Sequence, residues 1–379
     1  MCQFDTLRRC LTVSDVFKEL DTLPKTLEKT YENILLRIPD AYQGKALKLL
    51  RWLAFSGRPV TIIEAAEVLA VNLEEKIYDP GLKLLDSDDI MILCSSLVVR
   101  ATKVKAHDFL HPELYDGYYT EDFAYTYHKR KSKDSVIQLA HFSVKDYLVA
   151  RTPKSGPVAF FTLDPAPSQL VMVEICLTYL LHSPFSTGYC NEGERLERAR
   201  DWPLYQYASN FWMFHLNRIE DPIPERCWGL IDRFYQTRNM PDGGNFVSWI
   251  SMMVPQIEYD DAMKSEPLYY AASFGSLPLV KKLCSLGANV EAPGGRYGST
   301  AVHVAVFRRQ LNVVKFLVEE NLPAADITSR NSVGETCIYW AQTNDDREME
   351  AFLVEHGAKR WRIRQLRHTD TKHRRKSEL

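Results

Sequence analysis

The sequence predicts a mainly α-helical protein with one small β-ribbon. Apolar residues recur at spacings of three and four over most of the chain, which is the period of a helix that buries one face. Segments that read as strands occur at two places, 97–101 and 136–142. In the last third, similar segments follow one another at intervals of roughly 34 residues. This repetition predicts a short solenoid of helix pairs.

Composition places the chain among ordinary globular proteins. Of its 379 residues, 45% are hydrophobic and 25% are charged, and the length suggests two or three domains. The formal net charge of −2 combines an acidic body with a basic end. Residues 1–359 contain 39 Lys and Arg against 47 Asp and Glu, whereas 360–379 contain 8 basic and 2 acidic residues. We expect this end to be a disordered basic tail, in which "KHRRK" offers a nuclear import signal.

Cysteine spacing and hydropathy indicate the compartment. The 8 cysteines include no pair spaced as CxxC, so reduced thiols are expected. The N-terminus shows no apolar core of a secretory signal. The most apolar stretch, "LVMVEICLTYLL", is too short to span a bilayer and contains Glu174. We therefore expect a cytoplasmic protein without membrane contact.

Helical signals dominate residues 23–154. After Pro24, apolar residues recur at helical spacing up to Pro39, and a second helix is expected over 41–55. The segment "SGRPVT" breaks the chain. Thr61 and Glu64 then have the spacing of a capping box, which predicts the start of the helix "TIIEAAEVLAV".

A ribbon follows these helices. Its strands are expected at Leu97–Ala101 and Val136–Phe142, with an insertion at 103–134 that carries seven aromatic residues and the basic run "HKRKSK". Three helices followed by a two-stranded ribbon is the layout of a winged helix, with the insertion as an elongated wing. The segment 1–22 precedes this module.

The stretch "LAHFSVKDYL" predicts a strand that leads directly into a helix. Ser143 is the expected N-cap, and Phe142, Tyr147 and Leu148 are placed to face a core. His141 lies at the junction.

A Pro- and Gly-rich boundary separates this module from an α-helical linker domain at 160–258. Four tryptophans lie in it, and dense aromatic residues of this kind predict a packed helical layer: Trp202, Trp212, Trp228 and Trp249.

The repeat occupies 262–359 and its register can be checked residue by residue. Leu268, Val302 and Ile338 stand at one position, and three residues later each unit has an alanine. Small alanines allow two helices to approach closely, and glycine ends a helix in the left-handed conformation. The aligned residues are Ala271, Ala305 and Ala341, the turns Gly298–Thr300 and Gly334–Thr336, and the closing pairs Gly287–Ala288 and Gly357–Ala358.

These units resemble ankyrin repeats, whose first helix opens with T-P-L-H-x-A. The match is good at Thr300, Val302, His303 and Ala305, with Ala301 in place of proline. The resemblance implies a structural role for His303, and a protein-binding surface on the turns that precede the first helices. Since three units are near the minimum for stability, we expect the preceding helical layer to act as a cap. The expected partner-binding residues are Arg296, Tyr297, Ser299, Arg330, Asn331 and Glu335.

The front half resembles the region that follows the nucleotide-binding core in fungal NACHT-ankyrin proteins, signal-transduction NTPases of the STAND class related to NOD-like receptors. The resemblance rests on "LPKTLEKTYENILLRI", "ALKLLRWLAFSGRPVTIIEAAEVLAV", "DDIMILCSSLVV" and "LAHFSVKDYL" in this order, and more weakly on "WPLYQYASNFW". "CQFDTLRRC" resembles the end of the NACHT module. The chain departs from the family because it has no GxxxxGK[ST] loop. We therefore expect no catalytic residues and no cofactor.

The same resemblance implies a role for His141. In the relatives, a winged-helix histidine within H-x-S-F-x-E-Y/F contacts the phosphate of bound ADP, and His141 to Tyr147 is similar to that motif. It would have this role only if an upstream NACHT NTPase module supplied the nucleotide. Within this chain, a hydrogen bond from the imidazole to backbone is the better interpretation. The expected function is a non-enzymatic regulatory and interaction protein with an unidentified protein partner.

Two other kinds of site were weighed. His107 and His111 have a zinc-like spacing near His128, but Pro112 follows and no cysteine joins them, so no metal site is expected. Nucleic-acid binding by the winged helix, with help from the basic tail, is the alternative function. The helix that would enter a groove argues against it, because that helix carries Glu64 and Glu67 and no Lys or Arg.

Overall fold

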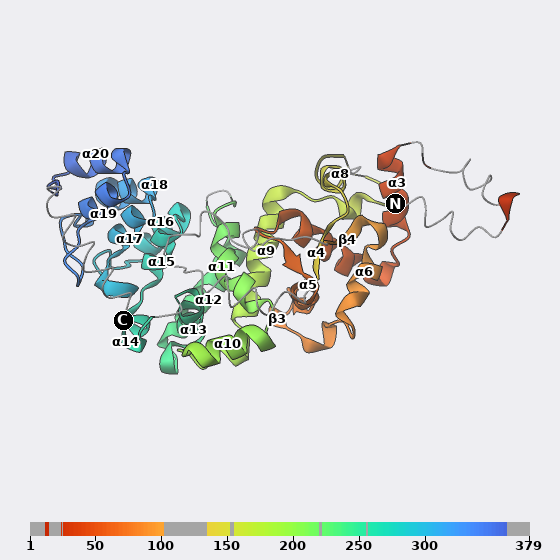
Figure 1. Cartoon of the computed structure of the whole chain (residues 1–379), viewed down its shortest axis with the longest axis horizontal. Helices are drawn as coiled ribbons and strands as arrows, with labels where there is room; N and C mark the ends of the chain where they lie inside the picture. Colours follow the sequence, from red (N-terminus) through yellow and green to blue (C-terminus); the bar gives the residue numbers. More distant parts are fainter. Residues whose placement is uncertain are drawn as a thin grey trace. The chain divides into compact units, whose positions relative to one another are not determined.

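The computed structural model describes residues 12–14, 24, 26–101, 135–151, 155–219, 222–254 and 257–361. The protein is mainly helical with a few short strands, as the sequence predicts. Its elements group into two units (Figure 1). The first unit consists of 1–179 and 198–219, and the second of 180–197 and 220–379.

The first unit packs helices around a small sheet. Helix α3 starts at the N-cap Thr26, whose hydroxyl accepts the backbone N–H of Lys29 at 3.2 Å. The apolar spacing seen in the sequence buries Tyr31, Ile34 and Leu35 of this helix. The helices of this unit are α3 (Leu27–Leu36), α4 (Asp40–Phe55), α5 (Ile62–Leu69), α6 (Ile90–Leu93), α8 (Phe142–Asp146), α9 (Pro165–Leu180) and α11 (Tyr205–Leu216).

The expected ribbon is present, and a third strand joins it. β4 (Val98–Ala101) pairs antiparallel with β5 (Val136–Leu139), as the sequence predicts. β1 (Val60–Thr61) adds to the other edge of β5 and gives the strand order β1-β5-β4. At two residues β1 is too short to show a strand period. A separate two-stranded ribbon, β2 (Val71–Asn72) with β3 (Ile77–Tyr78), was likewise not foreseen.

Helix α5 begins with the predicted capping box. The Thr61 hydroxyl accepts the Glu64 N–H at 3.3 Å, and the Glu64 carboxylate accepts the Thr61 N–H at 2.9 Å. Glu64 and Glu67 are both buried, however, so neither presents charge to a groove. The expectation that Glu64 and Glu67 would repel a nucleic-acid backbone was therefore wrong, because both carboxylates bind groups inside the protein: Glu64 pairs with Arg58, and Glu67 pairs with Lys83 and accepts the Tyr179 hydroxyl.

The start of α8 differs from the sequence interpretation in two ways. The N-cap is His141 rather than Ser143, because the imidazole Nδ1 accepts the Ser143 N–H at 3.2 Å. Tyr147 and Leu148 are buried as expected, but Phe142 is 73% exposed. Phe142 is the first residue of the helix, and its ring lies against the ring of His141, with centroids 4.2 Å apart and planes tilted by 38°.

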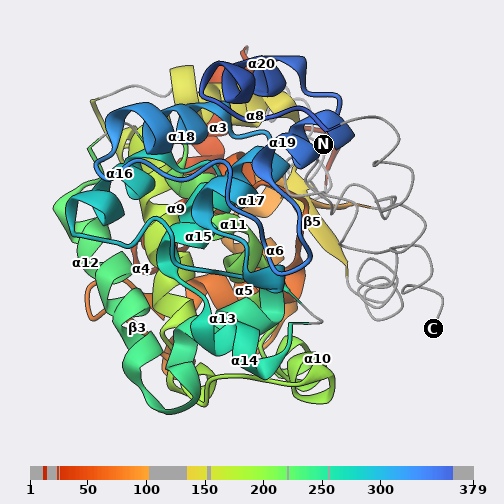
Figure 2. The ribbon, with the colours of Figure 1, turned by 90° about the vertical axis from the view of Figure 1, so that its left-hand side faces the viewer.

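The second unit consists of helix pairs. Figure 2 shows these helices following one another toward α20. α17 packs against α15 on one side and α19 on the other. The helices are α12 (Glu225–Gln236), α13 (Gly244–Met253), α14 (Tyr259–Lys264), α15 (Pro267–Ser273), α16 (Leu277–Ser285), α17 (Ala301–Phe307), α18 (Leu311–Lys315), α19 (Cys337–Thr343) and α20 (Arg347–Glu355).

The helices between 160 and 258 divide between the two units. α9 and α11 lie mainly in the first, α12 and α13 lie in the second, and α10 (Glu192–Asp201) has residues in both. The domain boundaries expected from the sequence remain predictions.

A backbone pattern recurs at the end of each inner helix, α15, α17 and α19. The second residue after each of these helices has a positive φ in all three repeats: 66° at Gly275, 59° at Arg309 and 49° at Asp345. The backbone N–H of the next residue then donates to the carbonyl of the aligned alanine. These bonds are Ser276 to Ala271 at 3.0 Å, Gln310 to Ala305 at 2.8 Å and Asp346 to Ala341 at 2.9 Å. The alanines that align in the sequence therefore occupy equivalent positions in the structure.

The repeats are spaced by 34 and 36 residues because the second repeat has a longer connection. In the first and third repeats, the backbone N–H of the closing alanine donates to the carbonyl of a leucine five residues earlier, Ala288 to Leu283 and Ala358 to Leu353. In the second repeat, the Ala325 N–H donates to the Leu317 carbonyl, eight residues earlier. The segment "NLPAAD" absorbs the extra residues here, where the closing Gly-Ala is missing.

Candidate partner-binding surface

Three of the predicted partner-binding residues hold the turns together. Ser299, Asn331 and Glu335 are all buried. The Asn331 side-chain amide donates to Ser299 Oγ at 3.3 Å and to the Glu335 carboxylate at 3.1 Å. Its Oδ1 accepts the N–H groups of Val333 and Glu335. Asn331 therefore links the turn before α17 to the turn before α19, and these side chains offer a partner little accessible surface.

Tyr297 and Arg330 are the exposed members of the set. Tyr297 is 40% exposed and has φ of 63°, and its carbonyl accepts the Ser332 N–H from the next turn at 2.8 Å. The Arg330 guanidinium donates to the Gly334 carbonyl at 2.7 Å and lies over the ring of Trp361, 5.5 Å from its centroid. For Arg296 the structure describes the backbone alone, within the short 3-10 helix Arg296–Gly298.

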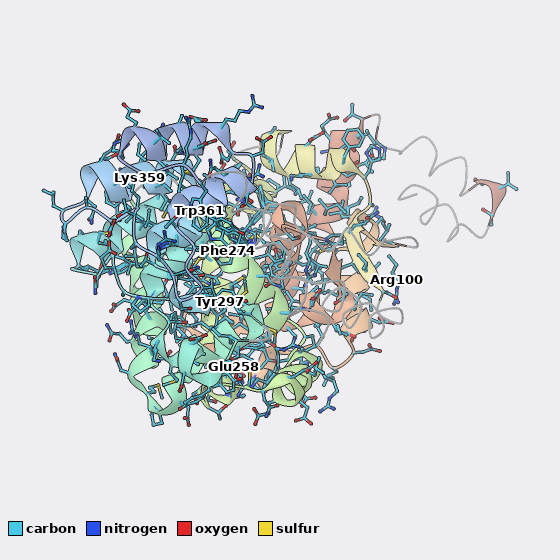
Figure 3. All side chains as sticks on the ribbon, turned by 60° about the vertical axis from the view of Figure 1, so that its left-hand side comes forward. Arg100, Glu258, Phe274, Tyr297, Lys359 and Trp361 are labelled. Carbon is cyan, nitrogen blue, oxygen red and sulfur yellow. The ribbon has the colours of Figure 1, made fainter. Side chains whose placement is uncertain are left out.

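The repeats also carry aromatic side chains that the sequence analysis did not select. Trp361 donates its indole N–H to Thr336 Oγ1 at 3.0 Å and packs on Tyr339, with ring centroids 5.4 Å apart. Phe307 and Trp340 meet edge to face at 4.7 Å. Figure 3 shows Tyr297 and Trp361 on the face of the array that this view presents. We call Tyr297, Phe307, Arg330, Trp340 and Trp361 the aromatic–arginine surface.

Acidic groups near this surface are engaged by backbone and side-chain donors. Glu291 accepts the Asp326 N–H at 2.8 Å, and Glu335 is buried against Asn331. The Thr328 hydroxyl and N–H both donate to the Asp326 carboxylate, which lowers its pKa. Arg330, by contrast, donates to a carbonyl rather than to a carboxylate. The surface therefore combines aromatic rings with a cation that can still attract an acidic group.

His303 braces its unit, as the resemblance implied. Its Nδ1 accepts the Thr300 N–H at 3.3 Å and Nε2 donates to the Ser329 carbonyl at 3.1 Å. Burial lowers the pKa of this imidazole, so the neutral form is favoured. This tautomer satisfies both ring nitrogens.

His141 lies on the first unit and is exposed. Its Nδ1 accepts the Ser143 N–H and lies 2.7 Å from Ser143 Oγ, which is in turn 2.7 Å from the Tyr31 hydroxyl. The expected bond to backbone is confirmed. The exposed ring also leaves this strand–helix junction open to an outside group.

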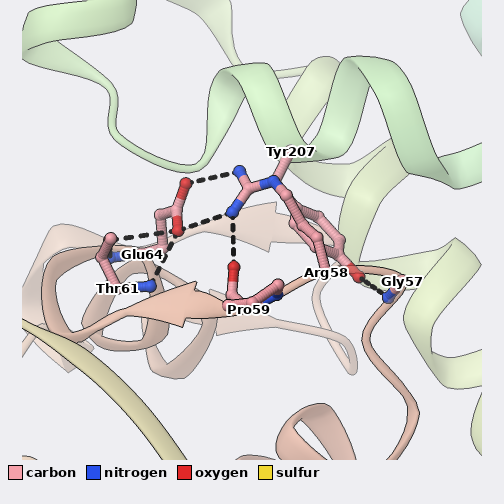
Figure 4. Close-up of polar contacts among 6 residues, drawn as sticks. All are labelled: Gly57, Arg58, Pro59, Thr61, Glu64 and Tyr207. Carbon is pink, nitrogen blue, oxygen red and sulfur yellow. Dashed lines mark hydrogen bonds and ion pairs between the residues drawn. The ribbon is translucent and has the colours of Figure 1, made fainter. Parts of the chain in front are cut away.

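A buried polar cluster in the first unit escaped the sequence analysis. Arg58 donates to both Glu64 carboxylate oxygens, at 3.1 and 2.7 Å, and to the Pro59 carbonyl at 2.8 Å (Figure 4). Its guanidinium lies 4.9 Å from the ring centroid of Tyr207, which comes from α11. The capping box predicted Glu64, but nothing local to Arg58 or Tyr207 indicates their contact.

The cluster continues through Tyr207. The Gly57 N–H donates to the Tyr207 hydroxyl at 3.1 Å, and this hydroxyl donates to His215 Nε2 at 3.0 Å. On the other side of the ring, His215 Nδ1 donates to Gln169 Oε1 at 2.6 Å. Burial, with the nearby Arg218 charge, lowers the pKa of His215 to about 3. The imidazole is therefore neutral and joins α9 to α11.

The described part of the chain contains no group of three or more His, Cys, Asp or Glu placed to hold a metal ion. The candidates His107, His111 and His128 fall in 102–134, outside the described residues. Nor is any described helix long and apolar enough to cross a membrane.

Comparison with known proteins bears on both units. A family model for ankyrin repeats matches residues 246–331 and 268–363, as three copies. The azaphilone pigments biosynthesis cluster protein L of Monascus ruber is 25% identical over 321 residues, which cover 79% of this chain and 60% of that protein. The chain thus spans about three fifths of the length of this relative. The matched part of the second unit, residues 246–363, therefore consists of ankyrin repeats, which generally mediate protein–protein interaction.

Proposed function

We propose that this chain is a non-enzymatic regulatory protein whose ankyrin repeats bind a partner protein through the aromatic–arginine surface. The observation that carries the proposal is the pairing of Arg330 with Trp361, together with the exposed side chain of Tyr297 in the turn before α17. Aromatic residues and arginine are enriched where protein interfaces bury their strongest contacts. Ser299, Asn331 and Glu335 keep a supporting role, because they hold the turns that present these side chains.

The first unit supports the signalling half of this proposal. Its motif order resembles the STAND proteins. β4 and β5 follow α3, α4 and α5, and β1, which lies between α4 and α5, completes the sheet β1-β5-β4; this arrangement suits a winged helix. His141 is exposed at the junction where the relatives contact nucleotide. We propose that an upstream NACHT-type module is a further partner, and that His141 faces it.

Affinity purification tests the partner surface. A Tyr297→Ala, Arg330→Glu double variant should lose the proteins that co-purify with the wild-type chain. The matched control is Lys281→Glu on the outer helix α16, a charge reversal at a side chain that is 42% exposed. Circular dichroism should show that both variants are folded. Equal recovery of every partner by the wild type and the double variant would refute the proposed surface.

ATP hydrolysis tests the non-enzymatic assignment. The purified chain should release no inorganic phosphate from ATP, because it has no phosphate-cradling loop. Clear ATP hydrolysis would overturn this part of the proposal. Reading the genomic DNA upstream of Met1 for an in-frame phosphate-binding loop tests the proposed partner module.

The compartment is also a proposal. We infer a cytoplasmic protein with an import signal in 360–379. A fluorescent fusion should enter the nucleus less when "KHRRK" is changed to "KHAAA", and an unchanged distribution would remove the import signal.

A further inference from the structure

Three cationic residues follow one another along α4 at intervals of three. Lys45, Lys48 and Arg51 are each half-buried. Residues three apart on a helix are neighbours, and the rise of about 1.5 Å per residue makes this row roughly 9 Å long. Gly44, one turn before Lys48 on the same helix, has open space where a side chain would stand.

No carboxylate neutralises this row within the described residues. Lys45 donates to the Leu82 carbonyl at 3.4 Å and Lys48 to the Val71 carbonyl at 2.6 Å. Arg51 has a buried Nε without a hydrogen-bond partner. The neighbouring Lys83 shows the contrast, because it forms an ion pair with the buried Glu67.

Bringing these charges together has an electrostatic cost. Burial, with the charges of Lys45 and Arg51, lowers the pKa of Lys48 to about 8. Burial also lowers the pKa of Arg51. Each Lys ammonium has three donors and uses one on a carbonyl, so further donors remain for a ligand. An anion placed against the row would relieve the repulsion and accept these hydrogen bonds.

We propose that Lys45, Lys48 and Arg51 form a binding site for a small phosphate-bearing ligand. Lys and Arg are the side chains that proteins use for phosphate oxygens, Lys as a point charge and Arg as a fork. The row is longer than one phosphate group, so a diphosphate should bind more tightly than inorganic phosphate. This site shares no residue with the aromatic–arginine surface or with His141, so the proposal does not rest on the proposed function.

Isothermal titration calorimetry of the full chain tests the site, with pyrophosphate and inorganic phosphate as probes at constant ionic strength. We expect pyrophosphate to bind at pH 7 with at least tenfold higher affinity than inorganic phosphate. Lys48→Gln and Arg51→Gln should each weaken pyrophosphate at least tenfold. The control is Lys29→Gln, at an exposed lysine that already pairs with Glu32, and it should leave affinity unchanged.

The calorimetry gives different results if Lys45, Lys48 and Arg51 have only a structural role. If Lys48 and Lys45 serve only to satisfy the carbonyls of Val71 and Leu82, pyrophosphate will not bind and the proposal fails. It fails also if Lys29→Gln weakens binding as much as Lys48→Gln, because binding then follows net charge alone. Should Lys48→Gln unfold, Lys45→Gln must show the same tenfold loss.

Discussion

At the scale of single residues, the first unit contains a pair of buried, oppositely charged groups that bond to each other. Arg58 is 6% exposed and Glu64 is fully buried, and each satisfies the other in a two-point contact. Burying two charges costs desolvation energy that only good geometry offsets. The pair therefore fixes how the turn before β1 meets α11, and removing one partner leaves the other charge uncompensated.

Arg58→Ala should lower the free energy of unfolding of the first unit by about 3–5 kcal/mol, because Glu64 loses its buried counter-ion. Lys29→Ala, which breaks an exposed pair with Glu32, should cost less than about 1 kcal/mol. Hydrogen-exchange protection of α5 measures both changes and reports this unit alone. Similar losses in the two variants would contradict the buried pairing.

His215 gives the first unit a pH dependence of known sign. Its folded pKa is about 3, below the roughly 6.5 of an unfolded histidine, so the unfolded chain binds more protons between these values. The stabilisation that the neutral, buried His215 gives the folded state is fully present above about pH 6.5. It declines as the pH falls below this value, by at most about 1.4 kcal/mol per pH unit. Urea unfolding measured between pH 7.5 and 5 should show that the free energy of unfolding falls less steeply with falling pH for His215→Gln than for the wild type. Equal pH dependence in the two proteins would show that folding does not lower the pKa of His215.

At the scale of elements, backbone conformation decides what a glycine does. Gly229 lies inside α12 with open space where a Cβ would stand. Gly357 also has open space, but its φ is 98° and it closes the third repeat. The two positions therefore differ in backbone strain rather than in crowding.

Gly229→Ala should stabilise the second unit by about 0.5–1 kcal/mol, because alanine favours the helix. Gly357→Ala should destabilise it by about 1 kcal/mol or more, because a side chain is strained at this φ. Urea midpoints of the two variants and the wild type provide the measurement. The same sign for both would contradict the conformations described.

The same scale shows where sequence reading succeeds. Thr61 with Glu64 predicted the start of α5, and the alanine register predicted three equivalent helix corners, because both patterns act within a few residues of the chain. The N-cap of α8 was assigned to Ser143 although His141 fills it, since both side chains can accept a backbone N–H. Burial of Ser299, Asn331 and Glu335 was missed, because it results from contact between two turns about 32 residues apart.

At the scale of the whole molecule, each unit is held by packing between distant segments. In the second unit, Trp249 of α13 lies 5.0 Å from Tyr270 of α15, ring to ring. Glu266, just before α15, forms an ion pair with Arg238 beyond α12. These contacts place the helices before the repeats against the first inner helix, where a cap on a three-repeat array is expected.

Trp249→Ala should destabilise the second unit by about 3–5 kcal/mol, since it empties a fully buried site. Trp340→Ala should cost clearly less, because Trp340 is half-buried. Hydrogen exchange of α15 and α17 should accelerate in the first variant and change little in the second. Equal protection in both would show that the array is stable without its cap.

The amino-acid sequence by itself determined the helical class, the ribbon of β4 with β5 and the ankyrin register, since apolar period, capping residues and glycine conformation are local properties. Tertiary structure alone decided that β1 joins the sheet, that Glu64 and Glu67 face inward, and that His215 is neutral. It also divided the expected surface into buried and exposed residues. The physical reason is that burial and pairing depend on which distant segment lies opposite, and no short pattern records that neighbour.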